Sequence, residues 1–60
     1  MKPGDLVRFR EDTFMPQELW GRCGVVIARH LRDEWVLYDV VVGDDVVLHV
    51  IGDDVEVVDD

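Results

Sequence analysis

The tripeptide Gly-Asp-Asp occurs twice in this chain, at residues 43–45 and 52–54. Paired aspartates after a glycine hold catalytic metals in some polymerases. A divalent cation, however, needs several carboxylates that converge on one ion, usually with further ligands from another element. Each stretch instead separates two valine-rich runs, where glycine supplies a positive φ and aspartate bonds to the nearby backbone. The sequence therefore favours two chain reversals over a metal site.

Cys23, His30 and His49 are the other side chains with metal-binding or nucleophilic chemistry. They lack the close paired spacing of a zinc site, such as C-x₂-C or H-x₃-H, and a cysteine in a strand is typically a small buried hydrophobe. The chain contains no serine for a serine triad and no glycine-rich phosphate loop. A chain this short also rarely encloses a substrate. We therefore expect no catalytic residue, no metal site and no cofactor, and predict that the protein is not an enzyme.

The length of 60 residues predicts a single domain, residues 1–60, with a thin core. Cys23 is the only cysteine, which excludes an intramolecular disulfide and is typical of a reducing compartment. No run approaches the ~18 apolar residues of a membrane span, and the start lacks a signal-peptide pattern. We expect a cytoplasmic protein without membrane contact (in the host cytoplasm if a virus encodes it).

Alternating apolar and polar residues predict five strands. Valine is the commonest residue, and β-branched side chains favour pleated, half-buried surfaces. The predicted strands are residues 5–10, 22–30, 35–42, 46–51 and 55–58. The first two are joined by a long loop, residues 11–21, with one helical turn at 16–19. The later connections are a polar turn at 31–34 and the two Gly-Asp-Asp bends. Val7 and Phe9 share the inner face of the first strand, and Gly24 marks a bulge or a close backbone approach. Such short connections exclude parallel pairing.

The third and fourth predicted strands are apolar on both faces. In residues 35–42 the even-numbered positions are expected to point inward, and the odd-numbered positions, apart from Asp39, leave an apolar outer face. In residues 46–51 strict alternation puts Val46, Leu48 and Val50 on one face and the odd-numbered residues, with His49, on the other. Two such strands indicate burial against a second chain, so we expect self-association as a homodimer or a larger ring.

The net charge of −8 makes this an acidic protein, and the charge is unevenly distributed. Residues 1–32 carry six basic and four acidic side chains, whereas residues 33–60 carry ten acidic side chains and no Lys or Arg. On average such a chain repels a phosphate backbone, while its first half can attract one. The arginines that could form one positive patch are Arg8, Arg10, Arg22, Arg29 and Arg32. They either bind RNA or DNA or pair with carboxylates of the acidic half.

Four segments resemble the SH3-like small barrels of bacteria and phages. Residues 2–9 (KPGDLVRF) resemble the Lys-x-Gly-Asp-x-Val start of that group, including its KOW type, and residues 21–26 (GRCGVV) resemble its Gly-x-x-Gly-x-Val second strand. Residues 34–40 (EWVLYDV) resemble the tryptophan-led third strand of Src-homology domains, and residues 50–58 (VIGDDVEVV) resemble the fourth strand, 3₁₀ corner and closing strand. The resemblance implies an all-β fold, a small five-stranded antiparallel SH3-like barrel, and a viral (phage) or bacterial accessory protein.

The sequence departs from the proline-reading members of that class at their binding groove. Trp35 matches their tryptophan, but Ile51 and Asp54 stand where they have Pro and Tyr, and the first strand has no tyrosine. We therefore predict a non-catalytic interaction module that binds another protein or assembles with itself. The alternative is KOW-like binding of RNA or DNA through the arginines.

Large apolar side chains give the candidate protein interface. Phe14, Met15 and Trp20 lie close together in the long loop, where they either complete the core or form an exposed patch. Trp35 and Leu37 belong to the outer face of the third strand. The predicted interface residues are Phe14, Met15, Trp20, Trp35 and Leu37. The two tryptophans are the expected main contacts, because aromatic side chains dominate binding hot spots.

Overall fold

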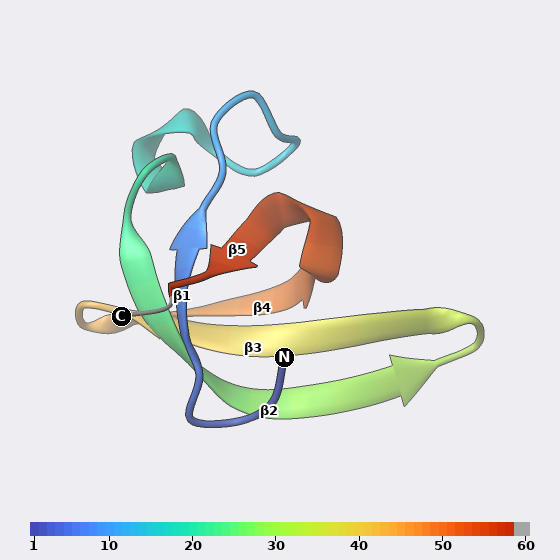
Figure 1. Ribbon diagram of the computed structural model, residues 1–60. Coiled ribbons are helices and arrows are strands. Elements are labelled where there is room, and N and C mark those ends of the chain that lie inside the picture. The colour runs from blue at the N-terminus through green and yellow to red at the C-terminus, as the bar shows by residue number, and fades with distance from the viewer. Residues whose placement is uncertain (59–60) are drawn as a thin grey trace.

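Five antiparallel strands form one sheet in the order β4-β3-β2-β1-β5 (Figure 1). The computed structural model describes residues 1–58. The strands are β1 (Leu6–Phe9), β2 (Cys23–Arg32), β3 (Trp35–Val42), β4 (Asp45–Ile51) and β5 (Val55–Val57), and the 3₁₀ helices are η1 (Gln17–Leu19) and η2 (Gly52–Asp54). Neither helix in residues 1–58 has the length and apolar character needed to cross a membrane. The predicted all-β fold with five antiparallel strands is confirmed.

The sheet is open rather than closed into a barrel. β4 and β5 are its edge strands, and no backbone pairing joins them within residues 1–58. The expectation of a closed barrel is thus not met by the backbone pairing. The second strand runs two residues further than predicted, to Arg32, so the polar turn shrinks to Asp33 and Glu34. The helical turn predicted in the long loop is confirmed as η1.

The core lies on the inner face of the sheet and is mainly aliphatic. In β1, Val7 and Phe9 are 0% and 1% exposed, as their alternation predicts. In β3 the even-numbered residues from Tyr38 onward are buried, which confirms the predicted inner face. The buried core consists of Val7, Phe9, Val26, Tyr38, Val40, Val42, Val50 and Val55. Because each buried side chain of this size contributes about 1.5–3 kcal/mol, this cluster is the main source of stability.

Gly24 lets β2 approach β3 closely. A Cβ atom at this position would lie 2.6 Å from the Cγ1 of Val40 and 2.6 Å from the backbone oxygen of Val41, which is closer than van der Waals contact. On its other side, Gly24 pairs with Val7 of β1. The predicted close backbone approach is therefore confirmed. It holds this part of β2 tightly between two neighbouring strands.

A β-bulge in β2 lies opposite Asp39. Val26 pairs with Val40 and Ala28 pairs with Asp39, so β2 holds one more residue than β3 over this step. A bulge increases the local twist and bends the strand. The bend divides β2 into a proximal part, residues 23–26, and a distal part, residues 27–32, which runs out along the hairpin with β3 (Figure 1).

A second bulge lies in β4 and overturns the predicted alternation there. The pairing with β3 shifts between Val47 and Val50, and His49 adopts a φ of 60°. Val50 is fully buried and Val47 packs against the core, whereas Val46 and Leu48 are 52% and 58% exposed. The prediction that Val46, Leu48 and Val50 share a face is wrong, because the extra residue of the bulge reverses the alternation.

Both Gly-Asp-Asp stretches are chain reversals, as predicted. Gly43 adopts a φ of 61° in the turn between β3 and β4. The second stretch forms η2, where the backbone carbonyl of Asp54 accepts a hydrogen bond of 2.8 Å from the amide of Arg10. The turn at residues 43–44 and η2 lie at opposite ends of β4, so their carboxylates do not converge on one point.

Candidate interaction surfaces

An apolar row crosses four strands on the outer face of the sheet. Leu6 pairs with Val25, Val25 with Val41, and Val41 with Val46, so β1 to β4 each place an aliphatic side chain beside the next. Leu6, Val25 and Val46 are 41%, 41% and 52% exposed. We call these four residues the apolar row. They present contiguous hydrophobic surface to solvent.

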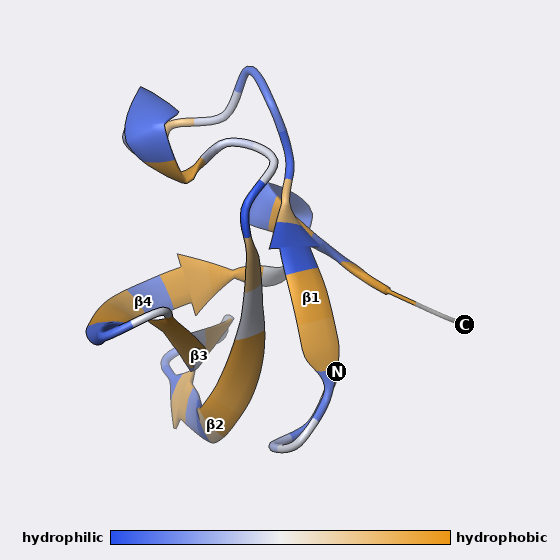
Figure 2. Cartoon of the chain, turned by 90° about the vertical axis from the view of Figure 1, so that its left-hand side faces the viewer, coloured by the Kyte–Doolittle hydropathy of each residue, from blue (hydrophilic) through white to orange (hydrophobic). Residues whose placement is uncertain are grey.

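Further apolar side chains lie on the same face of β3, between Asp39 and the turn that joins β2 to β3. Leu37 and Trp35 occupy the same face of β3 as Val41, because side chains two residues apart on a strand point the same way. Trp35 is 63% exposed, and Ile27 at the β2 bulge is 49% exposed. The cartoon coloured by hydropathy shows that hydrophobic residues occupy long stretches of β1 to β4 (Figure 2). Trp35 and Leu37, predicted as interface residues, therefore lie on an apolar outer face.

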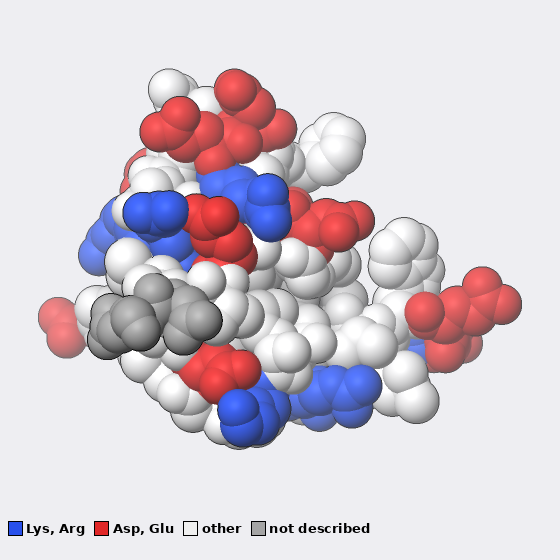
Figure 3. Space-filling view, in the orientation of Figure 1, with Lys and Arg blue, Asp and Glu red and all other residues white. Residues whose placement is uncertain are grey.

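Acidic turns lie at both ends of this face. The turn between β2 and β3 carries Asp33 and Glu34. The turn between β3 and β4 carries Asp44, and Asp45 follows at the start of β4. All four residues are exposed, and none forms an ion pair within residues 1–58. Carboxylates are visible at both lateral ends of the molecule, with Lys and Arg side chains along the lower edge between them (Figure 3).

The predicted interface residues of the long loop have separate roles. Met15 packs against the core, as does Leu19, and the Trp20 ring donates its Nε1–H to the carbonyl of Met15 over 3.1 Å. Phe14 is fully exposed, at 103%. The loop and the β2–β3 turn beside Trp35 lie at different ends of the molecule (Figure 1). The five predicted interface residues are thus not brought onto one surface.

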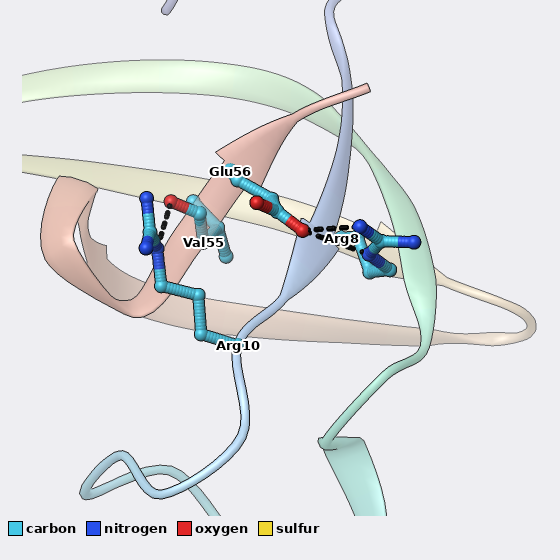
Figure 4. A network of polar contacts seen from close by, with 4 residues as sticks. All are labelled: Arg8, Arg10, Val55 and Glu56. Carbon is cyan, nitrogen blue, oxygen red and sulfur yellow. Dashed lines mark hydrogen bonds and ion pairs between the residues drawn. The ribbon is translucent and has the colours of Figure 1, made fainter. Parts of the chain in front are cut away.

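Two of the predicted nucleic-acid contacts are engaged within the sheet (Figure 4). Arg8 donates its Nε–H to Oε1 of Glu56 over 2.9 Å, and its Nη2 forms an ion pair with the same oxygen. This hydrogen bond holds the pKa of Glu56 below its ordinary value and the pKa of Arg8 above its own. Arg10 donates its Nε–H to the carbonyl of Val55 over 3.3 Å. Both arginines therefore tie β1 to β5.

The other three predicted arginines lie in different places. Arg22 lines an open cavity of about 250 Å³ beside the long loop, together with Glu18 and Asp45. Arg29 and Arg32 lie on the distal part of β2, toward the β2–β3 turn. The Lys and Arg side chains visible in Figure 3 lie in separate groups, at the upper left and along the lower edge of the view. The five arginines do not form one positive face.

Sequence reasoning missed a polar cluster between the two bulges. Nε2 of His30 lies 2.8 Å from Oδ2 of Asp39. The hydrogen bond from His30 holds the pKa of Asp39 below its ordinary value, and the nearby His49 acts in the same direction. Oδ1 of Asp39 is buried and has no hydrogen-bond partner of normal geometry within residues 1–58. These three side chains line an open cavity of about 320 Å³ together with Leu37 and Leu48.

The position of this cluster points to a structural role. Asp39 lies opposite both bulges, so its link to His30 braces β3 against β2 where the regular ladder is interrupted. The only signal in the sequence was a lone charged residue in an otherwise apolar strand. Within residues 1–58, no three His, Cys, Asp or Glu side chains are grouped to hold a metal ion. Cys23, expected to be buried, is exposed.

Comparison with known proteins gives no match. No family model, no curated protein and no solved structure matches the chain.

Proposed function

We propose that this protein is a small non-catalytic interaction module that binds another protein through the outer face of its sheet. The observation that carries the proposal is the apolar row, in which four strands each contribute an aliphatic side chain to a face open to water. A sheet face that stays solvated normally carries polar residues in alternation with the core positions. A contiguous exposed apolar surface with a polar border is typical of a protein-binding site.

The charges around this face favour a basic partner. The acidic turns at the two ends of β3 contain Asp33, Glu34 and Asp44, and none of these carboxylates is ion-paired within residues 1–58. Lys or Arg residues around an apolar centre complement both features and also raise the rate of encounter. A second copy of this chain has the same acidic turns and a net charge of −8, which oppose face-to-face association. The outer face is therefore proposed for a different protein.

The proposal includes the SH3-like small-barrel class for the fold. Its support is the order of elements: a short first strand, a long loop, a bent second strand, two hairpins, and a 3₁₀ corner before the last strand. Polyproline binding does not follow from that class, since Ile51 and Asp54 stand at the corner in place of Pro and Tyr. A phage or bacterial origin and a cytoplasmic location belong to the same proposal.

Binding of RNA or DNA through the arginines has weaker support. Phosphate neutralisation provides most of the affinity for nucleic acid, so the arginines have to be free and close together. Arg8 is engaged by Glu56 and Arg10 by the carbonyl of Val55. Of the remaining arginines, Arg22 lies on the loop side and two lie on the distal part of β2, so no surface of residues 1–58 brings more than two of the five together without a partner.

The test is affinity capture directed at the outer face, followed by titration with the purified partner. The baits are the wild type, Val25→Asp, Val46→Asp and the matched control Gln17→Asp, which adds the same charge on η1, away from the apolar row. Circular dichroism verifies that each bait is folded. We expect a basic protein to be retained by the wild type and by Gln17→Asp and lost by the two row variants. Burying an unpaired carboxylate costs about 3 kcal/mol, so calorimetry should show Kd rising about 100-fold.

A second arm measures the anisotropy of labelled mixed-sequence RNA and duplex DNA at low and moderate salt. Binding that weakens steeply with salt and is lost in Arg29→Glu would support the nucleic-acid alternative. Retention of the captured protein by all four baits would count against the outer face as its binding site.

A further inference from the structure

Phe14 is the most exposed large apolar side chain among the residues that the structure describes. It lies in the long loop between β1 and β2, and its exposed fraction of 103% means that the folded chain covers none of it. Two other apolar side chains of the same loop, Met15 and Leu19, pack against the core instead. The fold therefore does not use Phe14, although burial of such a side chain against another surface is worth about 10- to 150-fold in affinity.

The backbone beside Phe14 is held in place by its neighbours. Met15 donates its amide N–H to Oγ1 of Thr13 over 3.2 Å, and the carbonyl of Met15 accepts the Nε1–H of Trp20 over 3.1 Å. The packing of Met15 against the core fixes the same point of the loop. An aromatic side chain on a segment that is already ordered loses little conformational freedom on binding. Phe14 is thus presented to solvent from a preorganised loop.

The loop around Phe14 is acidic. Residues 11–20 contain Glu11, Asp12 and Glu18, and they contain no Lys, Arg or His. All three carboxylates are exposed, and none belongs to an ion pair in the described part of the chain. Carboxylates gather at the top of the molecule in Figure 3, where Figure 1 shows this loop. One aromatic side chain therefore stands among unpaired negative charges.

We propose that Phe14 is the anchor of a second recognition site, which inserts into an apolar pocket bordered by Lys or Arg on a partner protein. A central aromatic anchor within a charged border is the arrangement of protein-interface hot spots. The three loop carboxylates select a basic border by charge complementarity. The same carboxylates oppose a surface of anionic lipids, and a second copy of this chain carries a net charge of −8. The site is distinct from the apolar row, none of whose residues belongs to the loop.

Because nothing in the fold covers Phe14, its replacement separates binding from folding. Phe14→Ala should leave the urea midpoint of unfolding unchanged. Met15→Ala, in contrast, should lower that midpoint, since Met15 packs against the core. Any loss of binding in Phe14→Ala then reports on the contact itself.

Photo-crosslinking identifies the partner and the position of the contact. p-Benzoylphenylalanine is placed at position 14 of the full chain, which is then irradiated in a bacterial lysate. The matched control carries the same group at position 31, because Leu31 is also an exposed apolar residue (72%) and lies on the distal part of β2. We expect a protein that is crosslinked from position 14 and not from position 31, attached at an apolar residue with Lys or Arg nearby.

Calorimetry with that protein in purified, unmodified form measures the contribution of the anchor. Phe14→Ala should raise Kd about 30-fold, and the control Leu31→Ala should leave it unchanged. Asp12→Asn should raise Kd about threefold at low salt and less at high salt, because added ions screen the lost attraction. Asparagine tolerates the φ of 61° found at Asp12, so this variant changes the charge and keeps the loop conformation.

The row variant Val25→Asp separates this site from the outer face. It should leave the affinity for the crosslinked protein unchanged, so failure of the outer-face proposal and failure of this one give different results. The inference would be overturned by the absence of a crosslink specific to position 14, by a crosslink to lipid or nucleic acid in place of protein, or by full affinity of Phe14→Ala. An equal loss of affinity in Val25→Asp and Phe14→Ala would show that the loop is not a separate site.

Discussion

The proximal and distal parts of β2 differ in what lies beside them. The proximal part is held between β1 and β3, and β5 lies beyond β1 with Glu56 in reach of Arg8. The distal part has β3 alone, and its Arg29 and Arg32 form no ion pair within residues 1–58. Arginine therefore stabilises the sheet beside the proximal part of β2, whereas on the distal part it remains available to contact a partner. The number of neighbouring strands decides between these roles.

The proximal and distal parts of β2 also differ in how tightly their residues are packed. In the proximal part, Gly24 lies so close to Val40 that a side chain has no room, and Val26 is 1% exposed. In the distal part, most residues are exposed, and Leu31 reaches 72%. Regions with few buried contacts open at a lower free energy than the core. We infer that the proximal part carries the stability of the fold and that the distal part is the region suited to making new contacts.

The largest expected effect comes from Gly24→Ala, which disrupts the proximal part. The added Cβ would lie 2.6 Å from the Val40 side chain and from the Val41 backbone oxygen, so two strands have to move apart. Overpacking of this kind costs about 3 kcal/mol, which is most of the stability of a domain this small. We expect a large decrease in the free energy of unfolding, measured by urea denaturation.

Gly52→Ala is the matched control for this prediction. Nothing lies within 4 Å of a Cβ at Gly52, so this substitution should change the free energy of unfolding by less than about 0.5 kcal/mol. Equal effects of the two alanines would show that the proximal part is not packed more tightly than the rest of the molecule.

The inner faces of the first and third strands could be predicted because neither strand contains a bulge, so inward and outward positions alternate along their whole length. Val7, Phe9 and Tyr38 each follow a strict period of two, and all are buried. The fourth strand could not be predicted in the same way. Its bulge adds one residue between Val47 and Val50, and a run of valines carries no mark of where that residue is inserted. Whether the sheet closes into a barrel also depends on pairing between strands that are distant in the sequence, and the local pattern of apolar residues does not indicate that pairing.

The candidate surfaces could be predicted only where one strand defines them. Trp35 and Leu37 were identified because they share a face of one strand. The apolar row depends on the register between four strands, which no single segment specifies. For Arg8 the sequence left two alternatives open, contact with nucleic acid or pairing with a carboxylate of the acidic half; the structure shows the second, with Glu56, which lies 48 residues away in the sequence. Whether a charged side chain is free to bind a partner depends on contacts between distant segments, and the composition alone does not reveal those contacts.

Asp39→Asn tests the boundary between the two parts of β2 and should have an intermediate effect. The hydrogen bond from His30 lowers the folded-state pKa of Asp39 below its unfolded value near 3.8. The carboxylate therefore stabilises the fold at pH values above the unfolded pKa, and this contribution is lost as the pH falls through the folded-state pKa. We expect the urea midpoint of the variant to lie below that of the wild type at neutral pH and to converge with it in acid.

Hydrogen exchange of the same variant shows which part of β2 depends on this cluster. Amides of residues 28–32 should exchange faster than in the wild type, whereas those of the proximal part should be unchanged. Parallel pH curves for the two proteins, or faster exchange confined to the proximal part, would contradict the assignment of Asp39 to the junction between the bulges.

The smallest expected effect is that of Glu56→Gln, which releases Arg8. The two side chains of this ion pair are 54% and 39% exposed, so water and salt screen the interaction. Glu56 has a lowered pKa because of Arg8, so its contribution is present above the unfolded pKa and is lost in acid. The melting temperature should decrease less than in Asp39→Asn, and the difference from the wild type should shrink at high salt.

Glu11→Gln removes the same charge near Arg8 and Arg10 without breaking an ion pair found within residues 1–58, which makes it the control. If Glu56→Gln and Glu11→Gln have equal effects, net charge rather than the specific pair determines the stability of this region. If the Glu56→Gln effect instead persists at high salt, hydrogen bonding to Arg8 contributes beyond charge attraction. In that case Arg8 is structural in the stronger sense, whereas Arg29 and Arg32, which form no ion pair within residues 1–58, can contact a partner without loss of this interaction.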